Sequence, residues 1–270
     1  YNTFVTATWR LSSTAPNLQN IPVSDWIAWE VRDAFVSRFK KWKIIAFDYS
    51  QVEVRLLAIM SDDDNLLNAF KNNEDIHHKT AEFIFWKTII SSSERKIAKA
   101  VNFWVIYWIS WFWLSKMIKI PVKDANIYIN KFFESYPKVR DFLDNTISFA
   151  EENWYVETLF WRKRYINWIN DQNKIIKKAA EREAINMPIQ WTSADIIKIA
   201  MIKISDFIKK NKLKSKMIMQ VHDELVFDCY PSEENILEKE VKTIMENILK
   251  DKKITLKVDF WISDSWKYAK

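Results

Sequence analysis

The chain has 270 residues, a formal net charge of +6 and a sequence pI near 9.1. Its length allows one large domain or two subdomains with a sizeable core, and its modest basicity suits a polyanionic partner. A single cysteine, Cys229, excludes an internal disulfide and fits a reducing cytoplasm. No signal peptide is visible, and because the chain begins with Tyr1 we expect its natural start to lie upstream.

The predicted elements of the N-terminal part are an extended segment, a strand and two helices. Residues 1–24 are polar and turn-prone, with Pro16 and Pro22 interrupting them. The apolar run that follows predicts a strand over 43–49, and helical spacing predicts a helix over 51–60. The acidic run 61–64 is typical of a helix cap, and we expect a short helix after it that ends at Phe70.

Helices fill the middle of the chain, and strands return near its end. Periodicity predicts helices over 76–86, 93–107, 122–134, 137–152, 172–187 and 191–210. A strand–turn–strand over 216–228, a helix over 232–250 and a last strand over 254–261 follow. The nearly apolar run 101–114 is shorter than the ~20 residues that a membrane span needs, so we expect no membrane helix.

This distribution predicts the α+β fold class. Strands at both ends of the chain favour one small antiparallel sheet, and the helices between them favour a large helical insertion that projects from it.

Two acidic residues stand where strands end. Asp48 follows the apolar run 44–47 within Asp48-Tyr49-Ser50-Gln51-Val52-Glu53, and Asp223 lies in a tight turn between the apolar runs 217–221 and 225–227. Two such carboxylates are the ligands needed to hold a pair of divalent metals. Two metals about 3.5–4 Å apart can clamp the attacking and leaving oxygens of a phosphoryl transfer. The alternative is two ordinary surface acids at strand ends.

Between these acids lies a stripe of four residues at strict i+4 spacing: Arg95, Lys99, Phe103 and Tyr107. On a helix these side chains share one face, which presents two cations for phosphates and two rings for a base. A solvated basic face and ordinary aromatic core packing are the alternatives, and Lys96 lies off the stripe.

The order of acid, cationic–aromatic helix and second acid resembles DNA polymerases of family A, from about Thr6 to Lys270. The resemblance implies a discontinuous palm subdomain over 1–61 and 182–270 and a fingers subdomain over 62–181. It also implies that the thumb and exonuclease domains lie outside this chain. The implied cofactor is a pair of Mg²⁺ ions, and the implied partners are primer–template DNA and deoxynucleoside triphosphates. We expect a monomer without a membrane association.

The resemblance also assigns roles to single residues. Metal ligands would be Asp48, Asp223 and the backbone carbonyl of Tyr49, and the catalytic set would add Glu224, Arg95 and Lys99. Glu224 is expected to support the site rather than to bind metal. The nucleotide would contact Arg95, Lys99, Phe103, Tyr107, His77, Gln51 and Glu53. Glu53 corresponds to a steric gate against the ribose 2′-hydroxyl. DNA contacts would come from Arg10, Gln19, Asn20, Arg182, Asn186, Gln190 and His222.

The chain contains no glycine and 15 tryptophans, although average usage near 7% predicts roughly 19 glycines. Tryptophan stands where family A chains carry glycine, at Trp9, Trp104, Trp108, Trp154, Trp161, Trp191 and Trp261. Trp266 resembles a tryptophan that the family has. We interpret the pattern as a stop codon, UGA, that the source reads as glycine and that was translated here as tryptophan. The alternative, a genuinely tryptophan-rich protein, would need indoles at turns where glycine supplies positive φ.

These observations predict DNA-directed DNA synthesis, in which a primer 3′-hydroxyl attacks the α-phosphate of a deoxynucleoside triphosphate. Closing of the helix over 93–107 would bring its stripe onto a correctly paired nucleotide. A single-subunit RNA polymerase is disfavoured by Glu53 and by the pair Asp223-Glu224, because that family carries serine in the second position. A non-catalytic DNA-binding polymerase fragment stays open as an alternative.

Overall fold

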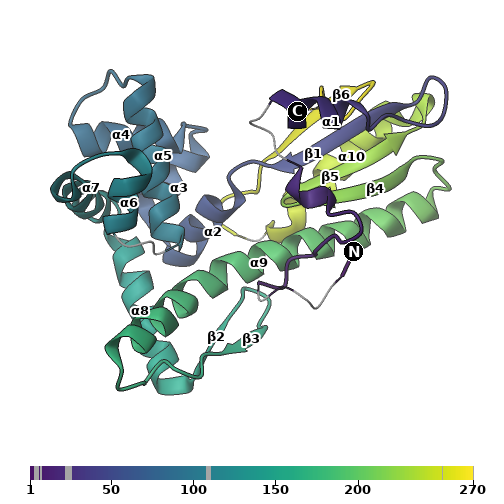
Figure 1. Ribbon diagram of the computed structural model, residues 1–270. Coiled ribbons are helices and arrows are strands. Elements are labelled where there is room, and N and C mark those ends of the chain that lie inside the picture. The colour runs from purple at the N-terminus through teal and green to yellow at the C-terminus, as the bar shows by residue number, and fades with distance from the viewer. Residues whose placement is uncertain (3–5, 7, 22–25, 108–110, 251, 270) are drawn as a thin grey trace. The chain divides into compact units, whose positions relative to one another are not determined.

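The computed structural model describes residues 1–2, 6, 8–21, 26–107, 111–250 and 252–269, which form two compact units (Figure 1). The first, here the sheet unit, comprises Tyr1–Val52, Ser193–Asp251 and Thr255–Lys270. The second, the helical unit, comprises Glu53–Thr192 and Lys252–Ile254. The palm and fingers boundaries expected from the sequence stay a prediction.

The sheet unit contains a four-stranded antiparallel sheet in the order β4-β5-β1-β6. Its strands are β1 (Lys43–Tyr49), β4 (Lys216–Val221), β5 (Glu224–Cys229) and β6 (Val258–Ser263). The α+β class and the small antiparallel sheet are therefore confirmed.

Strand β1 is interior to the sheet and buried on both faces, which explains its continuous apolar run. Ile44 and Ala46 lie in a core cluster with Trp266. On alternate positions, the Phe47 ring packs edge-on against Phe227, with 5.5 Å between centroids. Packing on both faces of β1 thus fixes the position of Asp48, near the end of the strand.

Helices complete the sheet unit. They are η1 (Leu18–Asn20), α1 (Trp26–Asp33), η2 (Pro231–Glu233), α10 (Glu234–Glu246), η3 (Asn247–Leu249) and the part of α9 (Lys174–Lys210) that begins at Ser193. Helix α10 buries Leu237, Val241 and Met245, which are four residues apart and so share one face.

The helical unit consists mainly of α2 (Val52–Ser61), α3 (Asp64–Lys71), α4 (Ile76–Phe85), α5 (Ser92–Tyr107), α6 (Trp111–Ile118), α7 (Val122–Ser135) and α8 (Pro137–Asn153). A short hairpin of β2 (Tyr155–Glu157) and β3 (Lys163–Tyr165) follows α8. The core of the helical unit includes Tyr136, Phe132 and Leu143, all essentially inaccessible to solvent.

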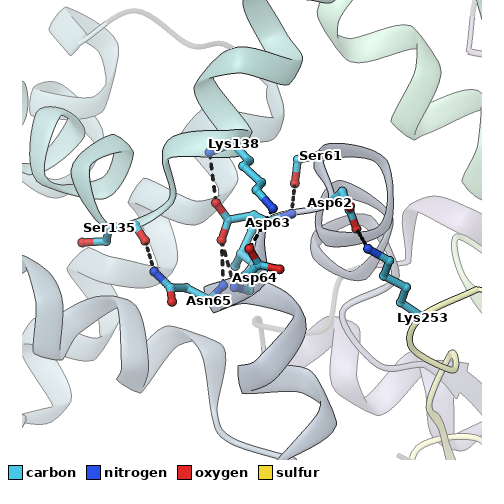
Figure 2. Close-up of polar contacts among 9 residues, drawn as sticks. Ser61, Asp62, Asp63, Asp64, Asn65, Ser135, Lys138 and Lys253 are labelled. Atoms are coloured by element: carbon cyan, nitrogen blue, oxygen red, sulfur yellow. Dashed lines mark hydrogen bonds and ion pairs between the residues drawn. The ribbon is translucent and has the colours of Figure 1, made fainter.

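The acidic run 61–64 caps α3, as the sequence predicts, and Figure 2 shows the contacts. Asp63 Oδ1 accepts hydrogen bonds from the backbone N–H groups of Asn65 (3.0 Å) and Leu66 (3.1 Å). Its other oxygen accepts from the N–H of Lys138, at the start of α8, at 3.1 Å. One buried carboxylate therefore joins two helix N-termini.

Three expected boundaries are wrong. The two helices expected over 172–187 and 191–210 are one helix, α9 (Lys174–Lys210), with Pro188 inside it. Proline costs a helix one hydrogen bond, but both neighbours of Pro188 are buried and their packing keeps the helix continuous. The helix expected over 232–250 is α10 flanked by 3-10 turns, and the strand expected over 254–261 begins only at Val258.

Helices α1 and α6 and the hairpin of β2 and β3 were not among the elements predicted from the sequence. Both strands of the hairpin are only three residues long, too short to show a period. Helix α6 lies partly in the apolar run 101–114. Among the described residues, no helix is long and apolar enough to cross a membrane.

Among the residues that the structure describes, four tryptophans adopt a left-handed backbone conformation. The φ angles are 57° at Trp9, 53° at Trp86, 65° at Trp154 and 63° at Trp161. Trp86 and Trp154 form the left-handed C-caps of α4 and α8, where glycine is the usual residue. By contrast, Trp104 and Trp191 are buried within α5 and α9, and Trp108 lies outside the described residues.

Candidate active site

The two predicted metal-binding acids lie at the same end of the sheet. Asp48 is the second-last residue of β1 and is opposite Glu224, the first residue of β5. Asp223 precedes Glu224 in the turn, and its carbonyl accepts a hydrogen bond of 3.2 Å from the N–H of Tyr49. The Asp223 carboxylate also accepts from the hydroxyl of Ser193 on α9, at 3.3 Å. Strand register therefore brings the backbones of the two acids together.

The turn that carries Asp223 contains only two residues, His222 and Asp223, between β4 and β5. His222 has a φ of 53°, and Asp223 has no positive φ. Positive φ at only the first central position is typical of a type II′ hairpin, which usually has glycine there. A histidine in this conformation stores local strain, a property that clusters at functional sites.

Glu224 is buried and is held away from solvent by Trp266, whose indole N–H donates to Glu224 Oε1 at 2.7 Å. The guanidinium of Arg32 lies 4.1 Å from the centre of the same indole. Burial lowers the pKa of Arg32, and the charge of Glu224 partly opposes this. These contacts are consistent with the supporting role expected for Glu224, which nevertheless stays a prediction.

The donor set at this end of the sheet suits a hard cation. The carboxylates of Asp48 and Asp223 and the carbonyl of Tyr49 offer only oxygen, as Mg²⁺ prefers, and Mg²⁺ keeps several of its waters. The Tyr49 side chain is engaged elsewhere, because its hydroxyl donates to the carbonyl of Met245 at 2.9 Å. Within the described part of the chain, no group of three or more His, Cys, Asp or Glu side chains forms a metal cluster. A metal here would thus depend on two carboxylates.

In the helical unit, the predicted stripe lies along α5. The rings of Phe103 and Tyr107 are stacked with 6.3 Å between centroids, and Lys99 Nζ lies 5.9 Å from the Phe103 ring. Lys99 is exposed, and the other three stripe residues are partly exposed. The face therefore offers charge toward its N-terminal end and aromatic surface toward its C-terminal end.

Glu53, at the start of α2, is joined to this stripe. The Tyr107 hydroxyl donates to Glu53 Oε2 at 2.9 Å, and Glu53 is buried. The carbonyl of Tyr107 accepts from Asn186 Nδ2 of α9 at 3.2 Å. Tyr107 therefore contacts both Glu53, the predicted steric gate, and Asn186, a predicted DNA contact, within the helical unit.

Asp75 connects α4 with α5. One of its oxygens caps α4 by accepting from the N–H groups of His77 (2.9 Å) and His78 (3.3 Å). The other accepts from Arg95 Nε at 2.6 Å. Burial raises the pKa of Asp75, but the hydrogen bonds from Arg95 and the two amides outweigh it, and the net pKa is lowered. Arg95 is therefore held by a carboxylate that stays ionised.

The residues predicted to contact DNA fall in both units. In the helical unit, Arg182, Asn186 and Gln190 follow one another at i+4 spacing on α9, with Arg182 exposed. In the sheet unit, Gln19 Nε2 donates to Gln220 Oε1 at 2.9 Å, and Asn20 and His222 are exposed. Arg10 is partly exposed, and its carbonyl accepts from the Thr6 hydroxyl at 2.6 Å. Gln51, with a φ of 53°, lies between β1 and α2.

Four residues of these sites were not predicted: Asp75, Ser193, Gln220 and Asn102, whose Nδ2 lies 2.8 Å from His77 Nδ1. Asp75 had a visible signal, because an acid directly before a helical run is typical of an N-cap. The other three are polar residues inside predicted helices or strands, where the sequence alone does not show which neighbour they meet.

Comparison with known proteins places this chain in a family. The sequence profile of DNA polymerase family A matches residues 1–268. The chain is 49% identical to DNA polymerase I of Caldicellulosiruptor bescii over 92% of its length and 44% identical to that of Bacillus subtilis over all of it. It spans 30% and 31% of those relatives, respectively, or about a third of their length.

A solved structure is similar over nearly the whole chain. It is described as the POL domain of Pol1 from M. smegmatis in complex with DNA primer-template and dNTP. The TM-score is 0.94 at 36% identity, and the match covers 99% of this chain and 47% of that one. This chain belongs to DNA polymerase family A, as the order of its motifs indicates.

Proposed function

We propose that this chain carries the nucleotidyl-transfer site of a DNA-directed DNA polymerase. In the reaction, the primer 3′-oxygen forms a bond to the α-phosphorus of a deoxynucleoside triphosphate. The bond between the α-phosphorus and the oxygen that bridges the α- and β-phosphates breaks. Pyrophosphate leaves with the electron pair of that bond. The observation that carries the proposal is the adjacency of Asp48 and Asp223 at one end of the sheet, in a chain that matches family A throughout.

Asp48, Asp223 and the carbonyl of Tyr49 would hold two Mg²⁺ ions. When bound, such ions lower the pKa of the primer hydroxyl and neutralise the triphosphate and its leaving oxygen. The pairing of β1 with β5 brings the backbones of Asp48 and Asp223 together, and a site organised before any ligand binds would cost less to assemble.

The helical unit would bind the nucleotide. Arg95 and Lys99 place positive charge for the phosphates, where charge changes most during the transfer. Glu53, buried and bonded to Tyr107, is a fixed wall of the kind that would exclude a ribose 2′-hydroxyl. The stacked rings of Phe103 and Tyr107 offer a surface for the sugar and base.

The partners proposed are primer–template DNA and deoxynucleoside triphosphates. Arg10, Gln19, Asn20, Arg182, Asn186, Gln190 and His222 would contact the DNA. Arg, Gln and Asn can reach the minor-groove acceptors that every base pair offers, so such contacts test pair geometry rather than sequence. The solved relative that was captured with primer-template DNA and dNTP supports this choice. We also propose that the protein acts as a monomer in the cytoplasm.

Primer extension tests the proposal. Asp48→Asn and Asp223→Asn should each lower the incorporation of deoxynucleotides by about a thousandfold or more, because each removes one of the two carboxylates that would hold the Mg²⁺ ions. Binding of primer–template, measured by fluorescence anisotropy, should stay within about twofold, because it depends mainly on phosphate contacts elsewhere. Lys96→Ala, off the stripe of α5, is the control. Substantial extension by either Asn variant would contradict the metal-binding assignment.

A further inference from the structure

A buried chain of hydrogen bonds runs from His77 to Tyr136 inside the helical unit. Asn102 Nδ2 lies 2.8 Å from His77 Nδ1, and the Thr80 hydroxyl donates to Asn102 Oδ1 at 3.1 Å. Thr80 Oγ1 lies 3.2 Å from the hydroxyl oxygen of Tyr136. All four side chains are less than 5% exposed. Buried polar groups that are all paired form a rigid unit.

The chemistry of Asn102 determines where His77 carries its proton. An amide nitrogen can only donate, so His77 Nδ1 must accept and cannot be protonated. At the other end of the amide, Oδ1 accepts from the Thr80 hydroxyl, so both ends of the Asn102 side chain are engaged. A neutral imidazole that accepts at Nδ1 carries its proton on Nε2, which then becomes a donor.

The surroundings keep this ring neutral. Burial lowers the pKa of His77 to about 4; Asp75 opposes the shift, and Arg95 and Lys99 add to it. The Nε2 atom has no hydrogen-bond partner among the described residues. The ring lies beside Phe103 of the stripe, with 6.2 Å between centroids. His77 thus has one engaged nitrogen and one available nitrogen next to the cationic face.

We propose that Asn102 is a positioning residue that holds His77 as its Nε2-protonated tautomer, so that Nε2–H donates a hydrogen bond to a phosphate oxygen of the incoming nucleotide. Thr80 and Tyr136 orient Asn102. The proton stays on Nε2 throughout, and the hydrogen bond aligns the triphosphate beside Arg95 and Lys99. This inference rests on the proposed function for its ligand, but the tautomer itself does not depend on it.

Nitrogen NMR of the ¹⁵N-histidine-labelled chain tests the tautomer directly. His77→Gln assigns the signals of this ring among the three histidines. We expect the wild-type ring to show a protonated Nε2 and an unprotonated Nδ1, unchanged between pH 8 and pH 5.5. Asn102→Asp keeps the shape but offers an acceptor, and should move the proton to Nδ1. Thr80→Val, a second isosteric variant, should weaken the preference without replacing the amide. A wild-type ring protonated at Nδ1 would overturn the proposal.

Steady-state kinetics with dTTP separates positioning from simple structural support. Asn102→Asp should raise KM for dTTP by about tenfold or more, because it removes one hydrogen bond to a charged group, with a smaller change in kcat. In a His77→Gln background, Asn102→Asp should raise KM for dTTP little further, because the two residues act through one contact. If Asn102→Asp raises KM equally in the wild-type and in the His77→Gln background, the proposal is wrong. If the chain does not polymerise at all, the NMR result still decides the tautomer, and the proposed function alone fails.

A second inference rests on a different observation, the four left-handed tryptophans. Of these, Trp86 and Trp161 are 80% exposed and Trp154 is 48% exposed, so burial of the indole does not compensate for the conformation. A left-handed residue with a Cβ costs roughly 1–2 kcal/mol, and glycine avoids this cost. Trp86 was not among the positions that matched family glycines, and its geometry therefore adds independent support.

We infer that Trp9, Trp86, Trp154 and Trp161 are glycines in the protein as its own host makes it. The codon UGA differs by one base from a tryptophan codon, UGG, and from a glycine codon, GGA. A host in which UGA is read as glycine would produce this pattern, and the chain printed above would carry tryptophan at each such codon. Trp266 is the internal control, because it is buried, has no positive φ and bonds Glu224 through its indole.

The gene and the native peptides decide this second inference. We expect UGA at the codons of the four left-handed positions and UGG at the codon of Trp266. Mass spectrometry of peptides from the native protein should find glycine at Trp86, Trp154 and Trp161 and tryptophan at Trp266. UGG codons at the left-handed positions, or tryptophan in those peptides, would refute the inference.

Discussion

Single side chains in this protein often hold two neighbours at once. Asp75 caps α4 with one oxygen and holds Arg95 with the other. Tyr107 donates its hydroxyl to Glu53 while its ring stacks on Phe103. Each such residue couples the position of a functional group to the integrity of a helix end or a ring stack. A substitution there changes geometry as well as chemistry, so isosteric variants are the informative ones.

The contact between Glu53 and Tyr107 makes a prediction about sugar selection. Glu53→Ala should raise the ratio of ribonucleotide to deoxynucleotide incorporation by about tenfold or more, because a steric barrier to the 2′-hydroxyl is removed. Tyr107→Phe removes only the hydroxyl that holds Glu53 and should raise the same ratio by less. Single-nucleotide incorporation kinetics measures both. An unchanged ratio in Glu53→Ala would show that Glu53 is structural.

At the scale of elements, the sequence predicted a helix correctly where apolar or charged residues recur over several turns or where a capping residue precedes the helix. The stripe on α5 and the cap of α3 are as the sequence predicts, because i+4 spacing and an acid before an apolar run have direct geometric meaning. The continuity of α9 through Pro188 was not predictable, because tertiary packing there overrides a local rule. The network of His77, Asn102 and Thr80 was also invisible, since its members meet only when α4 packs on α5.

The cap of α3 yields a stability prediction. Asp63→Ala should lower the free energy of unfolding by about 2 kcal/mol, because it leaves the amides of Asn65, Leu66 and Lys138 without their acceptor. Asp63→Asn keeps one acceptor oxygen and should cost less. Asp64→Ala, which removes only an exposed pair with Lys138, should shift the urea midpoint least. Equal shifts for Asp63→Ala and Asp64→Ala would contradict the role of Asp63.

The helix ends offer a second stability test. Trp154→Gly should raise the free energy of unfolding by about 1 kcal/mol, because the left-handed C-cap of α8 no longer carries a Cβ. Trp113→Gly is the matched control, since Trp113 is similarly exposed but lies inside α6. There glycine should cost about 1 kcal/mol relative to a helix-forming residue. Thermal or urea unfolding of both variants measures the difference, and destabilisation by both would count against a glycine at position 154.

At the scale of the whole molecule, the chain combines a sheet unit that carries the acids with a helical unit that carries the cations and rings. The fold class could be predicted because strands cluster at the two ends of the sequence. The division at Val52 and Thr192 could not, because α9 continues from one unit into the other without any change in composition that marks a boundary.

The missing glycines make the last prediction, which concerns the activity of the complete chain. A version with glycine at Trp9, Trp86, Trp104, Trp108, Trp154, Trp161, Trp191 and Trp261 should extend a primer faster than the chain as written. The left-handed turns lose their strain, and small residues at Trp104 and Trp191 remove bulk next to Phe103 of the stripe and next to Gln190 in the chain. Those two indoles are buried here, so their replacement alone leaves space that the fold must close. We therefore expect the left-handed substitutions to improve stability and the two buried ones to act on primer extension. Primer-extension rates for the four left-handed substitutions, for the two buried ones and for the complete version measure this, and a complete version that folds but extends no faster would contradict it.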